Sequence, residues 1–278
     1  MSFTTLVDVA TLAAHLGDLE WRVIDVRHQL SDVGYGERAY SESHIPGAVF
    51  LHCDRDLSGP VTGANGRHPW PERDRLVERL GEIGIGSQIQ VVVYDDAQGM
   101  IAGRLWALLR WLGHERVALL DGGLQAWRAA GGAMTALPPK VHAVAFNASA
   151  EVGPITTDDV LERLETPGMR LVDARSPDRY RGENETIDPV GGHIPGAVNR
   201  FFRDNLRADG RYKPAAELRA EWLAVLAGAL PEQVIHQCGS GVSACHNMLA
   251  MEIAGLPGSR LYAGSWSEWC VDPGRPIA

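Results

Sequence analysis

The sequence contains one long motif twice, and this internal repeat restricts the fold more than any other feature. WRVIDVR followed by HIPGAVF spans residues 21–50, and it returns as RLVDARS followed by HIPGAVN over residues 170–199. A repeat of this kind indicates two copies of one domain, and 278 residues is the length of about two ordinary domains. We therefore predict a first domain at residues 1–135 and a second at residues 156–278.

Residues 136–155 join the two copies. They combine prolines with alternating apolar residues and lack a helical pattern, so we expect an extended linker.

Each copy alternates short β-branched runs with helical patterns. The runs are RVIDV, IQVVVYD and VALLDG in the first copy, and RLVDA, QVIHQ and RLYAG in the second. This alternation predicts the α/β class, with two tandem domains that each hold a mainly parallel sheet with helices on both faces. In such sheets, ligands bind beyond the carboxyl ends of the strands.

The formal net charge of -9 argues against nucleic acid or a membrane surface as a partner, because both attract a basic face. The chain has no apolar run of about 20 residues and no basic leader, so we expect a cytoplasmic protein. Its four cysteines are too few for a disulfide scaffold and form no CxxC pair. We expect reduced thiols, no metal and no organic cofactor.

Cys238 lies between the strand QVIHQ and an apolar helix, in the loop CGSGVS. The glycines let the backbone curl so that successive N–H groups point at one anion, and the helix N-terminus adds partial positive charge. Such a loop stabilises a thiolate, the reactive form of cysteine, whereas a lone cysteine elsewhere is most often a core residue. We predict Cys238 as the nucleophile, with substrate contacts from Gly239, Ser240, Gly241, Val242 and Ser243.

The doubled HIPGA motifs, the loop CGSGVS and the closing GSWSEW resemble the tandem rhodanese family over essentially the whole chain, and most of all its 3-mercaptopyruvate sulfurtransferases. The resemblance implies that only the second domain is active and that Cys238 cycles between thiolate and persulfide. Sulfur would pass from 3-mercaptopyruvate to a thiol or cyanide, with release of pyruvate. Thiosulfate is the alternative donor.

The first copy lacks this nucleophile. An ungapped alignment that pairs Gly99 with Gly241 places Asp96 at the Cys238 position, and aspartate cannot carry sulfane sulfur. We predict that the first domain is catalytically silent and, as the resemblance implies, supplies one wall of the active cleft.

The resemblance also places Asp54 and His68 near Ser240 as partners in a proton relay. By residue type alone, a loop aspartate and a loop histidine are more often turn or surface residues.

Arg179 matches the family arginine that holds the anionic end of the donor, because a guanidinium can grip a carboxylate or thiosulfonate by paired hydrogen bonds. Mercaptopyruvate members usually carry a second arginine before HIPG, whereas GENETIDPVGG at residues 182–192 has no basic residue. Arg181 is a candidate substitute, although an arginine in so polar a loop is most often solvated.

Two arginines have a structural interpretation. Arg175 follows Asp173 as Arg27 follows Asp25, and this repetition in the silent copy predicts an ion pair within each domain. Among the remaining cysteines, we expect Cys245 to face the core, and Cys53 and Cys270 to be accessible but without a glycine loop.

Other protein classes fit less well. Phosphatases of a related fold need an arginine six positions after the cysteine, where this chain has Ala244. The loop satisfies the dinucleotide pattern GxGxxA, but it lies too near the C-terminus and lacks the acidic residue after the next strand. A non-enzymatic sulfur carrier or interaction scaffold stays open.

The expected partners are a small anionic sulfur donor and a thiol acceptor such as thioredoxin or a small dithiol. The neutral loop favours 3-mercaptopyruvate, because a monocarboxylate needs only one good cationic contact. The missing second arginine weakens that preference, so we expect some thiosulfate activity as well.

Overall fold

The computed structural model describes residues 2–149, 152–164, 166 and 168–278, which form two compact units. The first unit comprises Met1–Gly59, Pro71–Val152 and Asp209–Arg211. The second comprises Pro60–Trp70, Gly153–Ala208 and Tyr212–Ala278. The segment Pro60–Trp70 comes from the first half of the sequence, yet it packs with the second unit.

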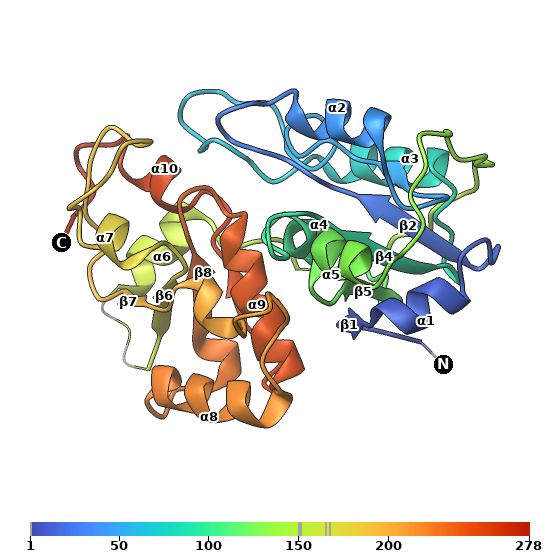
Figure 1. Cartoon of the computed structure of the whole chain (residues 1–278). Coiled ribbons are helices and arrows are strands. Elements are labelled where there is room, and N and C mark those ends of the chain that lie inside the picture. The colour runs from blue at the N-terminus through green and yellow to red at the C-terminus, as the bar shows by residue number, and fades with distance from the viewer. Residues whose placement is uncertain (1, 150–151, 165, 167) are drawn as a thin grey trace. The chain divides into compact units, whose positions relative to one another are not determined.

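The first unit contains a five-stranded parallel sheet in the order β1-β5-β4-β2-β3 (Figure 1). Its strands are β1 Leu6–Val7, β2 Trp21–Asp25, β3 Val49–Phe50, β4 Gln90–Tyr94 and β5 Val117–Leu120. Its helices are α1 Val9–Ala14, α2 Tyr35–Glu42, α3 Arg73–Glu82, α4 Ala102–Trp111 and α5 Gly123–Ala129.

The second unit contains a four-stranded parallel sheet in the order β7-β6-β8-β9 (Figure 1). Its strands are β6 Arg170–Asp173, β7 Val198–Asn199, β8 Val234–Gln237 and β9 Arg260–Leu261. Its α-helices are α6 Thr157–Arg163, α7 Pro177–Tyr180, α8 Ala215–Leu226, α9 Ser243–Ile253 and α10 Ser265–Trp269. Two short 3₁₀ helices cover Phe202–Asn205 and Pro231–Gln233.

Every residue of the interior strands β4 (QVVVY) and β8 (VIHQ) is buried, including the polar residues Gln90, His236 and Gln237. Helix α6 begins with a capping box, in which the Thr156 hydroxyl accepts the N–H of Asp159 at 3.2 Å and the Asp159 carboxylate accepts the N–H of Thr156 at 2.9 Å.

The predicted ion pair is present in each unit. Nη2 of Arg27 lies 2.7 Å from Oδ2 of Asp25, and Nη2 of Arg175 lies 2.7 Å from Oδ2 of Asp173. All four side chains are almost completely buried, so each charge needs the other. In the part of the chain that the structure describes, no helix is both long and apolar enough to span a membrane.

Candidate active site

Cys238 directly follows β8, at the carboxyl end of an interior strand of the second sheet. Its side chain is buried, and its backbone is fixed by the turn that begins α10. The N–H of Cys238 donates to Oγ of Ser265 at 3.0 Å, and its carbonyl accepts the N–H of Trp266 at 3.0 Å. The motif GSWSEW therefore holds the predicted nucleophile in place.

Gly241 is the residue in the loop that must be glycine. Its φ is +73°, and a Cβ at this position would lie 2.3 Å from the carbonyl oxygen of Ala263. Any side chain would push the loop away from the segment between β9 and α10. The helix that follows, α9, begins at Ser243, so its first N–H groups face the loop side of the sheet.

Ser240 and His68 meet in the second unit. Oγ of Ser240 and Nδ1 of His68 are 2.7 Å apart and share a hydrogen bond, and both residues are buried. The contact joins the loop after Cys238 to the segment Pro60–Trp70. Two residues of the predicted relay therefore lie together.

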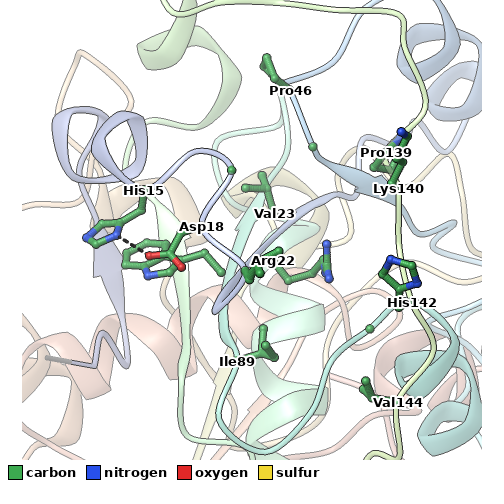
Figure 2. A pocket seen from close by; sticks show the side chains of 15 residues that line it. His15, Asp18, Arg22, Val23, Pro46, Ile89, Pro139, Lys140, His142 and Val144 are labelled. Carbon is green, nitrogen blue, oxygen red and sulfur yellow. Dashed lines mark hydrogen bonds and ion pairs between the residues drawn. The ribbon is translucent and has the colours of Figure 1, made fainter.

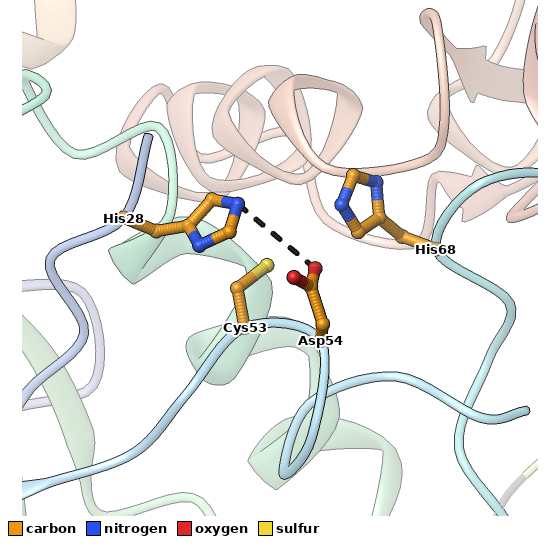
Figure 3. A group of neighbouring side chains, drawn as sticks. All are labelled: His28, Cys53, Asp54 and His68. Atoms are coloured by element: carbon orange, nitrogen blue, oxygen red, sulfur yellow. Dashed lines mark ion pairs between the residues drawn. The ribbon is translucent and has the colours of Figure 1, made fainter. Parts of the chain in front are cut away.

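Asp54 belongs to the first unit, where its Oδ1 lies 3.9 Å from Nε2 of His28 (Figure 3). Its predicted part in the relay stays a prediction.

The segment that carries His68 is anchored on α10. The N–H of Arg67 donates to Oγ of Ser267 at 3.1 Å, and the N–H of Ser267 donates to the carbonyl of Gly239 at 2.8 Å. Gly66 approaches so closely that a Cβ there would lie 2.8 Å from the carbonyl oxygen of Gly264. One serine thus connects this segment to the cysteine loop.

Two guanidinium groups converge on Gly239, the residue after the nucleophile. A Cβ built there would lie 2.9 Å from Nη2 of Arg67 and 3.6 Å from Nη1 and Nη2 of Arg179. Arg179 was predicted from the sequence, and Arg67 was not. The only local signal for Arg67 is its position next to His68 in GRHPW.

Asp188 and Glu185 hold these two arginines. Asp188 accepts hydrogen bonds from Nη1 of Arg67 and, at 3.2 Å, from Nη2 of Arg179. Glu185 accepts Nε of Arg179 at 3.0 Å and Nη2 at 2.9 Å. Burial and the Arg179 cation lower the pKa of Arg67, and a thiolate on Cys238 opposes that shift.

Arg181, the candidate second contact, faces solvent instead. Its side chain is 53% exposed and forms a double hydrogen bond with Glu183, with both distances 2.8 Å. The second cation near the cysteine loop is therefore Arg67, which comes from a distant part of the sequence.

The first unit contains the counterpart of the cysteine loop, and its register corrects the sequence alignment. Asp25 pairs with Tyr94 in the first sheet, and its repeat partner Asp173 pairs with Gln237 in the second. The residue after the strand, which corresponds to Cys238, is therefore Asp95 and not Asp96.

The loop of the first unit has one more residue between its strand and Gly99 than the second has before Gly241. The backbone of Gln98 accommodates the extra residue by adopting a left-handed φ of 62°. An ungapped alignment has no place for this insertion. Asp96, the residue predicted at the nucleophile position, accepts a hydrogen bond from the Tyr35 hydroxyl instead.

Asp95 fills the loop of the first unit with its own carboxylate. The carboxylate is fully buried and accepts four backbone N–H groups at 2.8–2.9 Å, those of Ala97, Gly99, Ile101 and Ala102. Burial raises the pKa of this carboxyl, and the N–H donors oppose the rise. A loop of this type therefore binds an anion, and in the first unit that anion is a side chain.

The other cysteines are buried. Cys245 is fully buried as expected, with its Sγ 3.3 Å from the carbonyl oxygen of Gly241. Cys53 and Cys270, which we expected to be accessible, are 1% and 5% exposed, because Cys53 packs in the first unit and Cys270 ends α10 against the core. Burial also raises the pKa of the Cys270 thiol.

A separate hollow of about 310 Å³ lies in the first unit (Figure 2). Its lining includes Arg22, Lys140 and His142, and none of the lining residues is a cysteine or a serine. It holds none of the residues predicted for the site.

Comparison with known proteins identifies the family. Residues 8–130 and residues 156–272 each match the rhodanese-like domain. This chain belongs to the rhodanese family.

Individual relatives agree with this assignment. A probable 3-mercaptopyruvate sulfurtransferase of Pseudomonas aeruginosa is 47% identical over 281 residues, which cover 100% of this chain and 99% of that protein. The thiosulfate sulfurtransferase of Mus musculus is 35% identical over 256 residues, or 89% of this chain and 84% of that protein.

A solved structure shows the same fold. The crystal structure of SseA from Escherichia coli, a 3-mercaptopyruvate sulfotransferase, is 30% identical with a TM-score of 0.82, and the match covers 95% of this chain and 99% of that one. These matches confirm the predicted family, the predicted tandem α/β fold and the predicted enzyme class, a sulfurtransferase.

Proposed function

We propose that this rhodanese transfers sulfur from 3-mercaptopyruvate to a thiol acceptor through a persulfide on Cys238 and releases pyruvate. The observation that carries the proposal is the position of Cys238 in a glycine loop whose counterpart in the first unit binds a carboxylate through four N–H groups. A thiolate and a persulfide are anions that such a loop stabilises. Residues 156–278 are the catalytic domain in this proposal, and residues 1–135 are catalytically silent.

The donor is held by its carboxylate. Arg67 and Arg179 converge on Gly239, next to the nucleophile, and a guanidinium can bind a carboxylate by two parallel hydrogen bonds. The loop residues Gly239, Ser240, Gly241, Val242 and Ser243 line the reacting end.

In the first half-reaction, the Cys238 thiolate attacks the sulfur of 3-mercaptopyruvate. An S–S bond forms, the C–S bond of the donor breaks, and its electron pair leaves as the enolate of pyruvate. The thiol proton of the donor moves to the enolate carbon, which gives pyruvate and the Cys238 persulfide anion. Ser240 and His68, joined by a 2.7 Å hydrogen bond, relay this proton. Asp54 is the third member of the proposed relay.

In the second half-reaction, an acceptor thiolate attacks the outer sulfur of the persulfide. The S–S bond to Cys238 breaks, the acceptor leaves as a persulfide and the Cys238 thiolate returns. Thioredoxin or a small dithiol is the expected acceptor, cyanide is an artificial one, and the expected location is the cytoplasm.

Thiosulfate is the second candidate donor, and the pair of guanidiniums favours it because a dianion needs more than one cation. Attack of the thiolate on its outer sulfur gives the same persulfide and releases sulfite. The mouse relative carries the name of this activity.

Steady-state kinetics with both donors and one common acceptor test the proposal. We expect a higher kcat/KM for 3-mercaptopyruvate, measurable activity with thiosulfate, and many turnovers per molecule, which a stoichiometric sulfur carrier would not show. If thiosulfate were better by about tenfold or more, a difference of about 1.4 kcal/mol, the mercaptopyruvate assignment would be wrong and only the persulfide mechanism would stand.

A further inference from the structure

Asp188 connects the two arginines of the donor site. Its carboxylate is 3% exposed, and it accepts hydrogen bonds from Arg67 on one oxygen and from Arg179 on the other. Its own N–H donates to Oε1 of Glu185 at 3.0 Å. Asp188 is therefore the carboxylate that contacts both guanidiniums, whereas Glu185 binds Arg179.

Glu185 adds a second buried negative charge. Its side chain is 4% exposed, it binds Nε and Nη2 of Arg179, and it lies 3.7 Å from Nη1 of Arg175. Arg175 is already paired with Asp173, so its charge is balanced within that pair. The carboxylates of Glu185 and Asp188 remain to offset Arg67 and Arg179.

The balance of charge decides which donor the site favours. Two guanidiniums and two carboxylates sum to zero, and partly buried charges are screened less by salt than exposed ones. The sulfur donor therefore meets arginine N–H groups in fixed positions but little net positive potential. Because Coulomb energy scales with the charge of the ligand, removal of one carboxylate helps a dianion about twice as much as a monoanion.

We propose that Asp188 is a positioning residue that sets donor preference: it holds Arg67 and Arg179 over Gly239, and its charge favours a monoanionic donor such as 3-mercaptopyruvate over dianionic thiosulfate. The inference rests on the proposed function, because it concerns the donor that reacts at Cys238. It also gives the acidic segment 182–192 a role, since this segment carries no arginine of its own.

The test is the donor ratio in Asp188→Asn, which removes the charge and keeps the size of the side chain. Poorer positioning of the arginines lowers kcat/KM for both donors, and this common loss cancels when kcat/KM for thiosulfate is divided by kcat/KM for 3-mercaptopyruvate. We expect the ratio to rise about tenfold. A purely structural role for Asp188 would lower both values and leave the ratio unchanged.

Two variants serve as controls. Asp188→Glu keeps the charge and should keep the ratio within about twofold of wild type. Glu183→Gln removes one negative charge from the same segment, but Glu183 is 56% exposed and pairs with exposed Arg181, so its ratio should also stay within about twofold. Glu185→Gln repeats the charge test if Asp188→Asn does not fold, and its ratio should rise in the same direction.

A binding measurement separates this inference from the proposed function. In a Cys238→Ser background, which cannot turn over, calorimetry with sulfate as the dianion and pyruvate as the monoanion should show that Asp188→Asn improves sulfate affinity more than pyruvate affinity. A ratio that is unchanged or lower in folded Asp188→Asn or Glu185→Gln would overturn the inference, whereas inactivity of wild type with both donors would overturn the proposed function alone.

Discussion

Oγ of Ser240 lies 2.7 Å from Nδ1 of His68, although 172 residues separate the two in the sequence. Ser240 is the second residue after Cys238, and His68 belongs to a segment of the first half of the chain that packs in the second unit. Both side chains are buried, and in the proposed mechanism this hydroxyl and this imidazole relay the thiol proton of the donor to the enolate carbon.

This contact predicts that Ser240 and His68 act as one unit. Ser240→Ala and His68→Gln should each lower kcat with 3-mercaptopyruvate by about 100-fold, the usual size of a proton-transfer contribution. The double variant should lose little more than either single one, because a shared step can be removed only once. Steady-state kinetics of the four proteins measure this, and independent, multiplicative losses would argue against a relay.

Arg67 and Arg179 should both contribute to donor binding. Arg179→Ala and Arg67→Met should each lower kcat/KM, with a loss of transition-state stabilisation of about 1.5–3 kcal/mol, since each removes a charged hydrogen-bonding group from the site. Arg181→Ala removes the same charge from an exposed position and should cost no more than about 0.5 kcal/mol. If Arg181→Ala were the variant that loses donor binding, the assignment of Arg67 as the second cation of the site would be wrong.

Gly241 and Gly196 offer a matched pair of substitutions. Both have positive φ, +73° and +78°, but a Cβ at Gly241 would meet the Ala263 carbonyl at 2.3 Å whereas one at Gly196 would meet nothing within 4 Å. Gly196→Ala should cost about 1 kcal/mol of unfolding free energy and retain activity. Gly241→Ala should cost more and lose most sulfur transfer, so equal effects in thermal melts and kinetics would contradict the assigned role of the loop.

Asp95 should be a stabilising residue of the first unit. In Asp95→Asn, the amide group can no longer accept all four N–H bonds, and each buried N–H left unpaired is costly, so we expect a loss of at least about 2 kcal/mol. The neighbouring Asp96→Asn, which affects one contact with Tyr35, should cost less than about 1.5 kcal/mol. Denaturant unfolding measures both, and a reversed order would contradict the stabilising role assigned to Asp95.

The sequence predicts the features that are local in the chain. The strand, the loop and the following helix around Cys238 lie within one stretch, and the pairs of Arg27 with Asp25 and Arg175 with Asp173 involve residues two apart. The repeat itself predicts two similar parallel sheets. Such features depend on short-range geometry, which residue type and spacing determine well.

The features that the sequence did not predict depend on contacts between distant segments. Arg67 reaches Gly239 only because Gly66 allows its segment to approach α10, and no local pattern marks that approach. The ungapped alignment pairs Cys238 with Asp96 because it cannot detect the one extra residue between β4 and Gly99, where Gln98 adopts a left-handed conformation. The burial of Cys53 and Cys270 follows from tertiary packing that composition does not reveal.

The most direct test of the account is the intact mass of the protein after treatment with 3-mercaptopyruvate in the absence of an acceptor. Wild type should gain the mass of one sulfur atom, and Cys245→Ser should gain the same, because Cys245 is fully buried against the carbonyl of Gly241. Cys238→Ser, with an unchanged melting temperature, should gain none. A sulfur adduct that persists in Cys238→Ser, or pyruvate release by wild type with no adduct at any time, would contradict the persulfide on Cys238.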